Sequence, residues 1–186
     1  VDNSVKKIIH DVVKRGDQAL FDYAKKFDQS LIDEKNILIP SDFRKSYKDK
    51  IDPETFNAFK IAIKNITNYH EKQKPSNYEI LSEGVKTSSI WKPIQSVGLY
   101  VPGGSAVYPS SLIMSVIPAI VAGVDRIVVV TPSHLNNINP YILALLDELK
   151  IKEVYQVGGA HAIAALPQND KLKIVHQKYW LPTTRK

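Results

Sequence analysis

The chain has 186 residues, which is enough for one ordinary domain or two small ones with a hydrophobic core. Apolar residues make up 44% and charged residues 24%, so the composition excludes a disordered or fibrous protein. The net charge of +6 comes from Lys and Arg residues that alternate with acidic residues along predicted helices. This pattern favours solvated helix surfaces over a nucleic-acid-binding patch.

Cysteine is absent from the sequence, which excludes disulfides, a thiol nucleophile and a thiolate metal site. This composition suits the reducing cytoplasm. The best candidate for a membrane span, 111–124, is interrupted by Pro118 and is shorter than the roughly 18 residues that a span requires. We therefore expect a cytoplasmic protein that does not cross a membrane.

The first part of the chain is predicted to be mainly helical. Apolar residues recur at three- and four-residue steps over 3–27 and the pattern breaks at Gly16, which indicates two amphipathic helices joined by a tight turn. A short β-branched stretch follows at 37–40. Either Ser41-Asp42 or Asp52-Pro53 offers capping chemistry for the helices after it.

A long helix and a hairpin precede the second part. Pro53 at a first helical position starts a predicted helix that ends near Gln73. The segment 78–93 alternates loosely, with a turn signal at Glu83-Gly84, and this is typical of a β-hairpin.

The second part alternates apolar strands with helices. The predicted strands are 97–101, 126–131 and 153–157, and the predicted helices are 110–122, 140–149 and 162–166. Strands and helices that alternate with short links indicate a parallel α/β unit with right-handed crossovers.

Ligands of such sheets bind beyond the carboxyl ends of the strands, where the sequence places 102–105, 132–134 and 158–161. Gly103-Gly104 and Gly158-Gly159 either let a ligand approach the backbone or serve packing alone. The neighbouring histidines, His134 and His161, are candidates to line this crevice.

The sequence assigns neither a catalytic residue nor a metal ligand. No pair among the five histidines has the helical spacing of a metal site with a carboxylate base, so we expect no zinc site from this chain. Ser105, Ser110 and Ser111 lack the glycine pattern of a nucleophile elbow, which favours helix caps.

Several motifs together resemble one enzyme family. VGLYVPGGS at 97–105, RIVVVTPS at 126–133 and VGGAHAIAAL at 157–166 occur in the order found in the histidinol dehydrogenase family. The segments 14–28 and 69–73 are also similar to that family, and the resemblance covers about 4–175.

The resemblance implies a fold, a reaction and a cofactor. The family oxidises L-histidinol through an aldehyde to L-histidine in histidine biosynthesis, with NAD as the oxidant and a zinc ion holding the substrate. It implies dinucleotide contacts from Tyr100, Gly103 and Gly104, while His161 stands where the family has a glutamine. The expected fold is α/β, with a helical N-terminal region followed by an incomplete Rossmann-like parallel domain.

The predicted divisions are a helical region with short strands at 1–96, a Rossmann-like domain at 97–175 and an aberrant tail at 176–186. At the tail the sequence departs from the family's KI-x-GPGN motif, and the zinc ligands and the Glu-His acid-base pair do not occur. We therefore expect a truncated homologue that is inactive alone and binds NAD weakly or not at all. Two alternatives stay open: half of a split enzyme completed by another chain, and a scaffold module that assembles with itself or a partner.

Overall fold

The computed structural model describes residues 3–103, 108–135 and 137–167, and the chain begins with two short helices. Helix α1 spans Asn3–Arg15 and α2 spans Asp17–Tyr23, which continues into a π-helical turn, η1, at Ala24–Asp28. Gly16 separates the helices at a φ of 63°, a conformation that glycine adopts without strain. The predicted pair of helices and its turn are confirmed.

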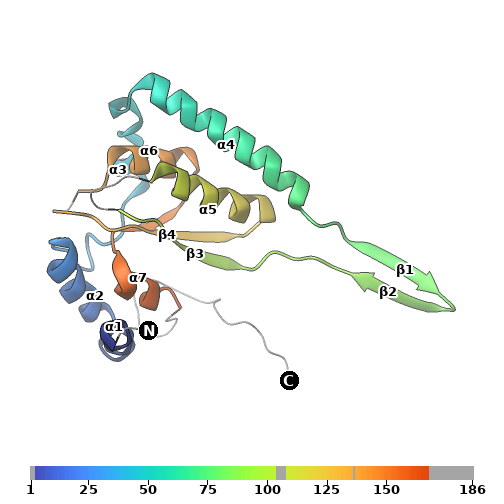
Figure 1. Cartoon of the computed structure of the whole chain (residues 1–186), viewed down its shortest axis with the longest axis horizontal. Coiled ribbons are helices and arrows are strands. Elements are labelled where there is room, and N and C mark those ends of the chain that lie inside the picture. The colour runs from blue at the N-terminus through green and yellow to red at the C-terminus, as the bar shows by residue number, and fades with distance from the viewer. Residues whose placement is uncertain (1–2, 104–107, 136, 168–186) are drawn as a thin grey trace.

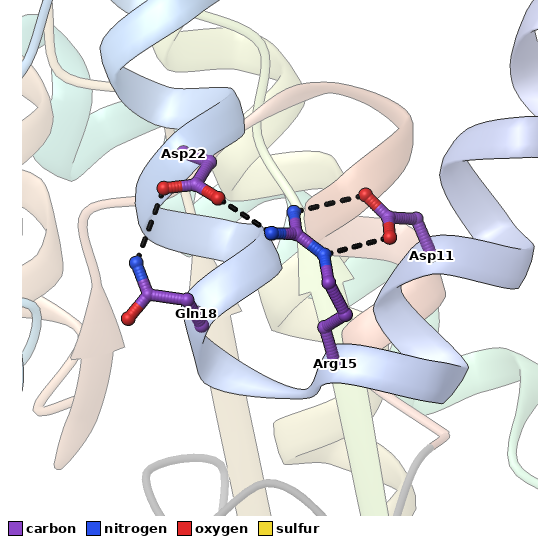
Figure 2. A network of polar contacts seen from close by, with 4 residues as sticks. All are labelled: Asp11, Arg15, Gln18 and Asp22. Atoms are coloured by element: carbon purple, nitrogen blue, oxygen red, sulfur yellow. Dashed lines mark hydrogen bonds and ion pairs between the residues drawn. The ribbon is translucent and has the colours of Figure 1, made fainter.

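Arg15 joins these two helices through side-chain contacts (Figure 2). Its Nε lies 2.7 Å from Asp11 Oδ1 and its Nη1 lies 2.7 Å from Asp22 Oδ2, and Gln18 donates to the second carboxylate. The guanidinium holds the pKa of both carboxyl groups below their usual range. The network thus links α1 to α2 across the turn at the molecular surface.

A long helix, α4, spans Pro53–Gln73 and follows the short α3 at Ser41–Lys45 and the 3-10 turn η2 at Lys48–Lys50. The Asp52 carboxylate caps α4, since its Oδ2 accepts a hydrogen bond from the Thr55 amide at 2.8 Å. Asp52-Pro53 therefore performs the predicted capping, whereas α3 follows Pro40 without a side-chain cap.

Three parallel strands form the central sheet in the order β3-β4-β5, of which β3 and β4 are labelled in Figure 1. Strand β3 is Ser96–Tyr100, β4 is Arg126–Val130 and β5 is Glu153–Tyr155. One helix follows each strand along the chain, in the order α5 at Pro109–Ala122, α6 at Pro140–Glu148 and α7 at Gly159–Ala165. The predicted α/β fold is confirmed. Helix α7 begins at Gly159, so His161 belongs to the helix and not to the preceding loop as predicted.

The β-branched stretch at 37–39 lies against the free edge of β5. Leu38 forms an antiparallel bridge with Tyr155, and the Ile39 amide donates to the Val154 carbonyl at 2.9 Å. On the other side of the bridge, the backbone amide of Gln156 donates to the Ile37 carbonyl at 2.8 Å. The stretch thus covers an edge that would otherwise expose unpaired backbone groups.

Each face of the sheet packs on its own set of helices (Figure 1). Val128 and Val130 of β4 point to a core shared with α1, α2 and α7, while Val129 points to a core shared with α5 and α6. Helix α4 covers α5 through partly buried Phe59 and Ile63. None of the described helices is long and apolar enough to cross a membrane.

A two-stranded ribbon connects α4 to the sheet and extends away from the body (Figure 1). Strand β1, Tyr78–Ser82, pairs antiparallel with β2, Val85–Ser89. Glu83 and Gly84 make the turn with positive φ values of 50° and 80°, which a two-residue hairpin turn requires. The predicted hairpin and its turn are confirmed.

Candidate functional site

The loops that follow the three parallel strands meet around Pro132. A Cβ atom added to Gly103 would lie 2.9 Å from the Pro132 carbonyl oxygen, and one added to Gly158 would lie 2.8 Å from Pro132 Cγ. Both glycines therefore permit the close approach of these loops, which is the packing interpretation for Gly103 and Gly158. The predicted clustering is confirmed for the described part of the loops; Gly104 lies outside the described residues, as does the tail at 176–186.

Tyr100 is the last residue of β3 and leads into the first of these loops. Its half-buried side chain packs against the core that contains α1, α2 and α7. One strand position earlier on the same face, Gly98 lets α7 lie directly on β3, since an added Cβ would be 2.7 Å from Leu166 Cδ2. Tyr100 and α7 thus share one face of the sheet.

His161 is enclosed in that core with only 1% of its surface exposed. Its imidazole packs beside the stacked rings of Tyr23 and Phe27, at centroid distances of 5.6 and 6.2 Å. Neither ring nitrogen makes a hydrogen bond with the described residues. Burial lowers the pKa of His161 to about 4, so the imidazole is neutral at physiological pH. The expectation that His161 lines an open crevice is not met by a side chain this deeply buried.

Asp28, at the end of η1, faces the same imidazole. Its Oδ2 lies 4.0 Å from His161 Nε2, and that oxygen is itself buried without a hydrogen bond to the described residues. Burial raises the pKa of Asp28, and the nearby His134 acts in the opposite direction. Asp28 was not singled out from the sequence because it follows a helix pattern with no local motif.

Two buried serines tie the segment after η1 to the end of β4. The Ser30 hydroxyl donates to the Ser133 carbonyl at 2.8 Å, and the Ser133 hydroxyl donates to Ser30 Oγ at 3.0 Å. The adjacent His134 is exposed and pairs through its backbone with Asn137 at 2.9 Å. The carboxyl edge of the sheet is therefore built partly from the N-terminal region, through Asp28 and Ser30.

A separate cavity of about 290 Å³ lies beside the covered edge of β5. Its wall combines the amides of Asn36, Asn137 and Gln156 with the rings of Phe43 and Tyr47. The side-chain amide of Gln156 already donates to the backbone carbonyl of Asn36 at 2.6 Å. Part of the polar lining of the cavity is therefore already hydrogen-bonded within the fold. This cavity does not include Tyr100, Gly103 or His161.

Metal-binding side chains do not gather anywhere in the described part of the chain. No three His, Asp or Glu residues within 3–103, 108–135 and 137–167 stand close enough to hold an ion. The pair of Asp28 and His161 falls one ligand short of such a group, and both lie in an apolar core. These residues do not fit a zinc ion.

The chain matches a model of the family described as "Histidinol dehydrogenase" over residues 1–172. It is 47% identical over 165 residues to a histidinol dehydrogenase from Listeria innocua, covering 88% of this chain and 38% of the relative. It is 43% identical over 162 residues to one from Caldanaerobacter subterraneus, covering 87% of this chain and 38% of the relative.

A solved structure agrees with these matches. The crystal structure of histidinol dehydrogenase from Elizabethkingia anophelis superimposes with a TM-score of 0.86 at 33% identity, over 94% of this chain and 40% of that chain. The chain thus spans about two fifths of the length of these relatives. With a family model matching nearly its whole length and the same fold in a solved relative, the chain belongs to the histidinol dehydrogenase family.

Proposed function

We propose that this chain supplies the dinucleotide-binding edge of a histidinol dehydrogenase and does not oxidise histidinol by itself. The observation that carries the proposal is the meeting of the loops after β3, β4 and β5 around Pro132, in a chain whose named relatives are histidinol dehydrogenases. Ligands of parallel α/β sheets bind at this edge. NAD would accept one hydride in each of two successive oxidations of the substrate.

The residues of this chain would bind and orient the dinucleotide. Tyr100 ends β3 at the edge, and Gly103 keeps its loop close to Pro132, which leaves the backbone accessible on the outer side. Gly104 belongs to the same proposed contact. His161 would act by supporting the start of α7, because a Cβ on Gly159 would lie 3.2 Å from its ring.

The groups that the reaction needs besides NAD are proposed to come from elsewhere. Oxidation of an alcohol requires a base that takes the hydroxyl proton and a metal that positions the substrate. The described residues offer no metal-binding group. We assign both tasks to the part of the family's length that this chain does not span.

A thermal-shift experiment tests NAD binding, since a ligand that binds only the folded state raises its melting temperature. We expect a small shift with NAD at millimolar concentration and none with histidinol or zinc. Tyr100→Ala should abolish the NAD shift. Tyr69→Ala is the matched control because Tyr69 is exposed on α4, away from the edge. A shift that survives Tyr100→Ala, or none at any concentration, would refute the assignment.

A second candidate function is half of a split enzyme. It is favoured by the coverage of only 38% of the Listeria innocua relative at 47% identity. Mixing this chain with the remaining part of that relative should restore NADH production from histidinol in the presence of zinc. Neither piece alone should do so, and a mixture as inactive as its parts would count against this candidate. The scaffold alternative stays a prediction.

A further inference from the structure

The cavity beside the covered edge of β5 is separate from the proposed dinucleotide-binding edge, since Tyr100 and Gly103 do not line it. Its volume of about 290 Å³ is close to the lower limit for small-molecule sites, which enclose roughly 300–1,000 Å³. Three segments form its walls: the 35–40 stretch, helix α3 with the turn after it, and the segment that leads into α6. A concave surface of this size between packed segments is suited to a small ligand.

The walls are held in place by the fold itself. Backbone hydrogen bonds tie the 37–39 stretch to β5 on both sides of Leu38, at 2.8 and 2.9 Å. Two further backbone hydrogen bonds of 2.9 Å join His134 to Asn137 and close the turn that carries Asn137. A cavity with preformed walls binds a ligand at a lower entropic cost than one whose walls have to be ordered.

The apolar part of the wall presents two aromatic rings. The ring centroids of Phe43 and Tyr47 lie 5.2 Å apart, with an angle of 56° between the ring planes. Tyr47 packs against the core shared with α5 and α6, and Leu143 of that core is 2% exposed and also lines the cavity. Phe43 remains 51% exposed. A flat ring of a ligand would pack on this wall and cover part of it.

The polar part of the wall offers hydrogen-bond acceptors. The side-chain nitrogen of Gln156 donates to the Asn36 carbonyl at 2.6 Å, and the side-chain nitrogen of Asn137 donates to the Leu135 carbonyl at 3.1 Å. Because a backbone carbonyl only accepts, these contacts fix which end of each amide is the oxygen. Within 3–103, 108–135 and 137–167, neither oxygen accepts a hydrogen bond. A ligand on this wall therefore has to donate N–H groups.

The charge of the lining is positive. Lys35 is exposed and lines the cavity, and none of the described lining residues is acidic. The neighbouring Asp33 carboxylate does not line the cavity, because it accepts the backbone amides of Lys35 and Asn36 at 2.8 and 3.0 Å. A cation without an acidic residue in the same lining attracts an anionic group.

We propose that this cavity binds a small anionic heteroaromatic compound. Its ring packs on Phe43 and Tyr47, and its N–H groups donate to the side-chain oxygens of Asn137 and Gln156. Its acidic group, a phosphate or a carboxylate, lies beside Lys35. The site is additional to the proposed binding of NAD and does not depend on it.

Isothermal titration calorimetry with AMP tests the class of ligand, because AMP has a flat ring, an amino group and a phosphate. We expect saturable binding with a dissociation constant of about 0.1 mM. Adenosine, which lacks the phosphate, and purine riboside monophosphate, which lacks the amino group, should each bind at least ~5-fold more weakly. Equal affinities for the three compounds, or no binding of AMP at roughly 10 mM, would overturn the proposal.

A matched pair of substitutions tests the aromatic wall. Phe43→Ala should weaken AMP binding at least ~5-fold, whereas Ile61→Ala should leave it within ~2-fold. Ile61 is the control because it is 54% exposed on α4, outside the cavity, against 51% for Phe43. The melting temperature without ligand checks that both variants fold. Equal effects of the two substitutions would contradict the assignment of the wall.

A second pair tests the cation. Lys35→Gln should weaken the binding of AMP and leave the binding of adenosine unchanged, since adenosine has no phosphate for the ammonium to contact. Lys64→Gln removes an exposed charge from α4 and should change neither. A loss of both affinities in Lys35→Gln would mean that the ammonium does not bind the phosphate, and the proposed orientation would be wrong.

The cysteine-free sequence allows a footprint that does not rely on a loss of affinity. Leu38 lines the cavity and is 43% exposed, so the thiol of Leu38→Cys should react with a small reagent and become protected when AMP is added. The thiol of Ile61→Cys should react at the same rate with and without AMP. Unprotected labelling of Leu38→Cys at saturating AMP would overturn the proposal.

Two results would assign the ligand or the cavity elsewhere. If Tyr100→Ala abolishes AMP binding and Phe43→Ala does not, AMP occupies the dinucleotide-binding edge, and the cavity proposal fails while the NAD proposal stands. If the Leu38→Cys thiol is protected only by the remaining part of a family member, a protein surface covers the cavity and the ligand proposal is wrong. The expected result is the reverse of the first: Tyr100→Ala keeps AMP binding, and Phe43→Ala keeps the NAD-induced thermal shift.

Discussion

Replacing His161 by leucine should make the stability of the folded chain less sensitive to acid. The imidazole is 1% exposed, and burial lowers its pKa from 6.5 to about 4. Between these pH values the unfolded chain binds a proton that the folded chain does not, so the free energy of unfolding rises with pH across this window. The full contribution of the neutral, buried imidazole to the free energy of unfolding is present above pH 6.5, and it is lost as the pH falls toward 4.

The size of the effect follows from the shift of about 2.5 pKa units, which corresponds to about 3 kcal/mol at the acid end of the window. This figure is an upper limit, because the carboxylate of Asp28 lies 4.0 Å from Nε2 and favours the protonated ring. Asp28 works against the pH dependence caused by His161. Because the pKa of Asp28 is raised, the folded chain binds the proton of that carboxyl more readily than the unfolded chain, and this lowers the free energy of unfolding as the pH rises.

Urea unfolding followed by circular dichroism at intervals from pH 7 to pH 4 measures this dependence. In His161→Leu the free energy of unfolding should fall less between pH 6.5 and 4 than in the wild type. His10→Leu is the matched control, because His10 is exposed on α1, and it should keep the wild-type slope. If His161→Leu retains the wild-type slope, the imidazole is not held neutral in the core and the reasoning fails.

Three further substitutions test local packing, capping and surface charge. Gly158→Ala should lower the free energy of unfolding by about 1–3 kcal/mol in urea titrations, because the new Cβ would clash with the Pro132 ring. The backbone itself would not be strained, since alanine tolerates the Gly158 φ of −129°. Asp52→Ala removes the hydrogen bond to the Thr55 amide and should speed amide hydrogen exchange in the first turn of α4, whereas Asp52→Asn should largely preserve protection. Arg15→Met should lower the melting temperature at low salt, and the difference should shrink at ~1 M salt as the surface ion pairs are screened.

Local features of the sequence predicted the main helices, the hairpin and the alternation of strands and helices in the parallel unit. Helical periodicity that breaks at Gly16 predicted α1 and α2, and the Asp52-Pro53 pair predicted the start of α4. Each signal depends on residues a few positions apart, which is why it can be read without tertiary contacts. The gathering of three loops at one edge was also predictable, because parallel strands end on the same side of a sheet.

Contacts between distant segments were decided only by the tertiary structure. No local pattern indicates that 37–39 pairs with β5, or that Ser30 bonds to Ser133 across 103 positions. The sequence placed His161 at a strand end, but packing of α7 against Tyr23 encloses it and brings Asp28 to its ring. Burial and partners depend on which surfaces the whole chain brings together, and those long-range choices follow from core packing and not from local propensity.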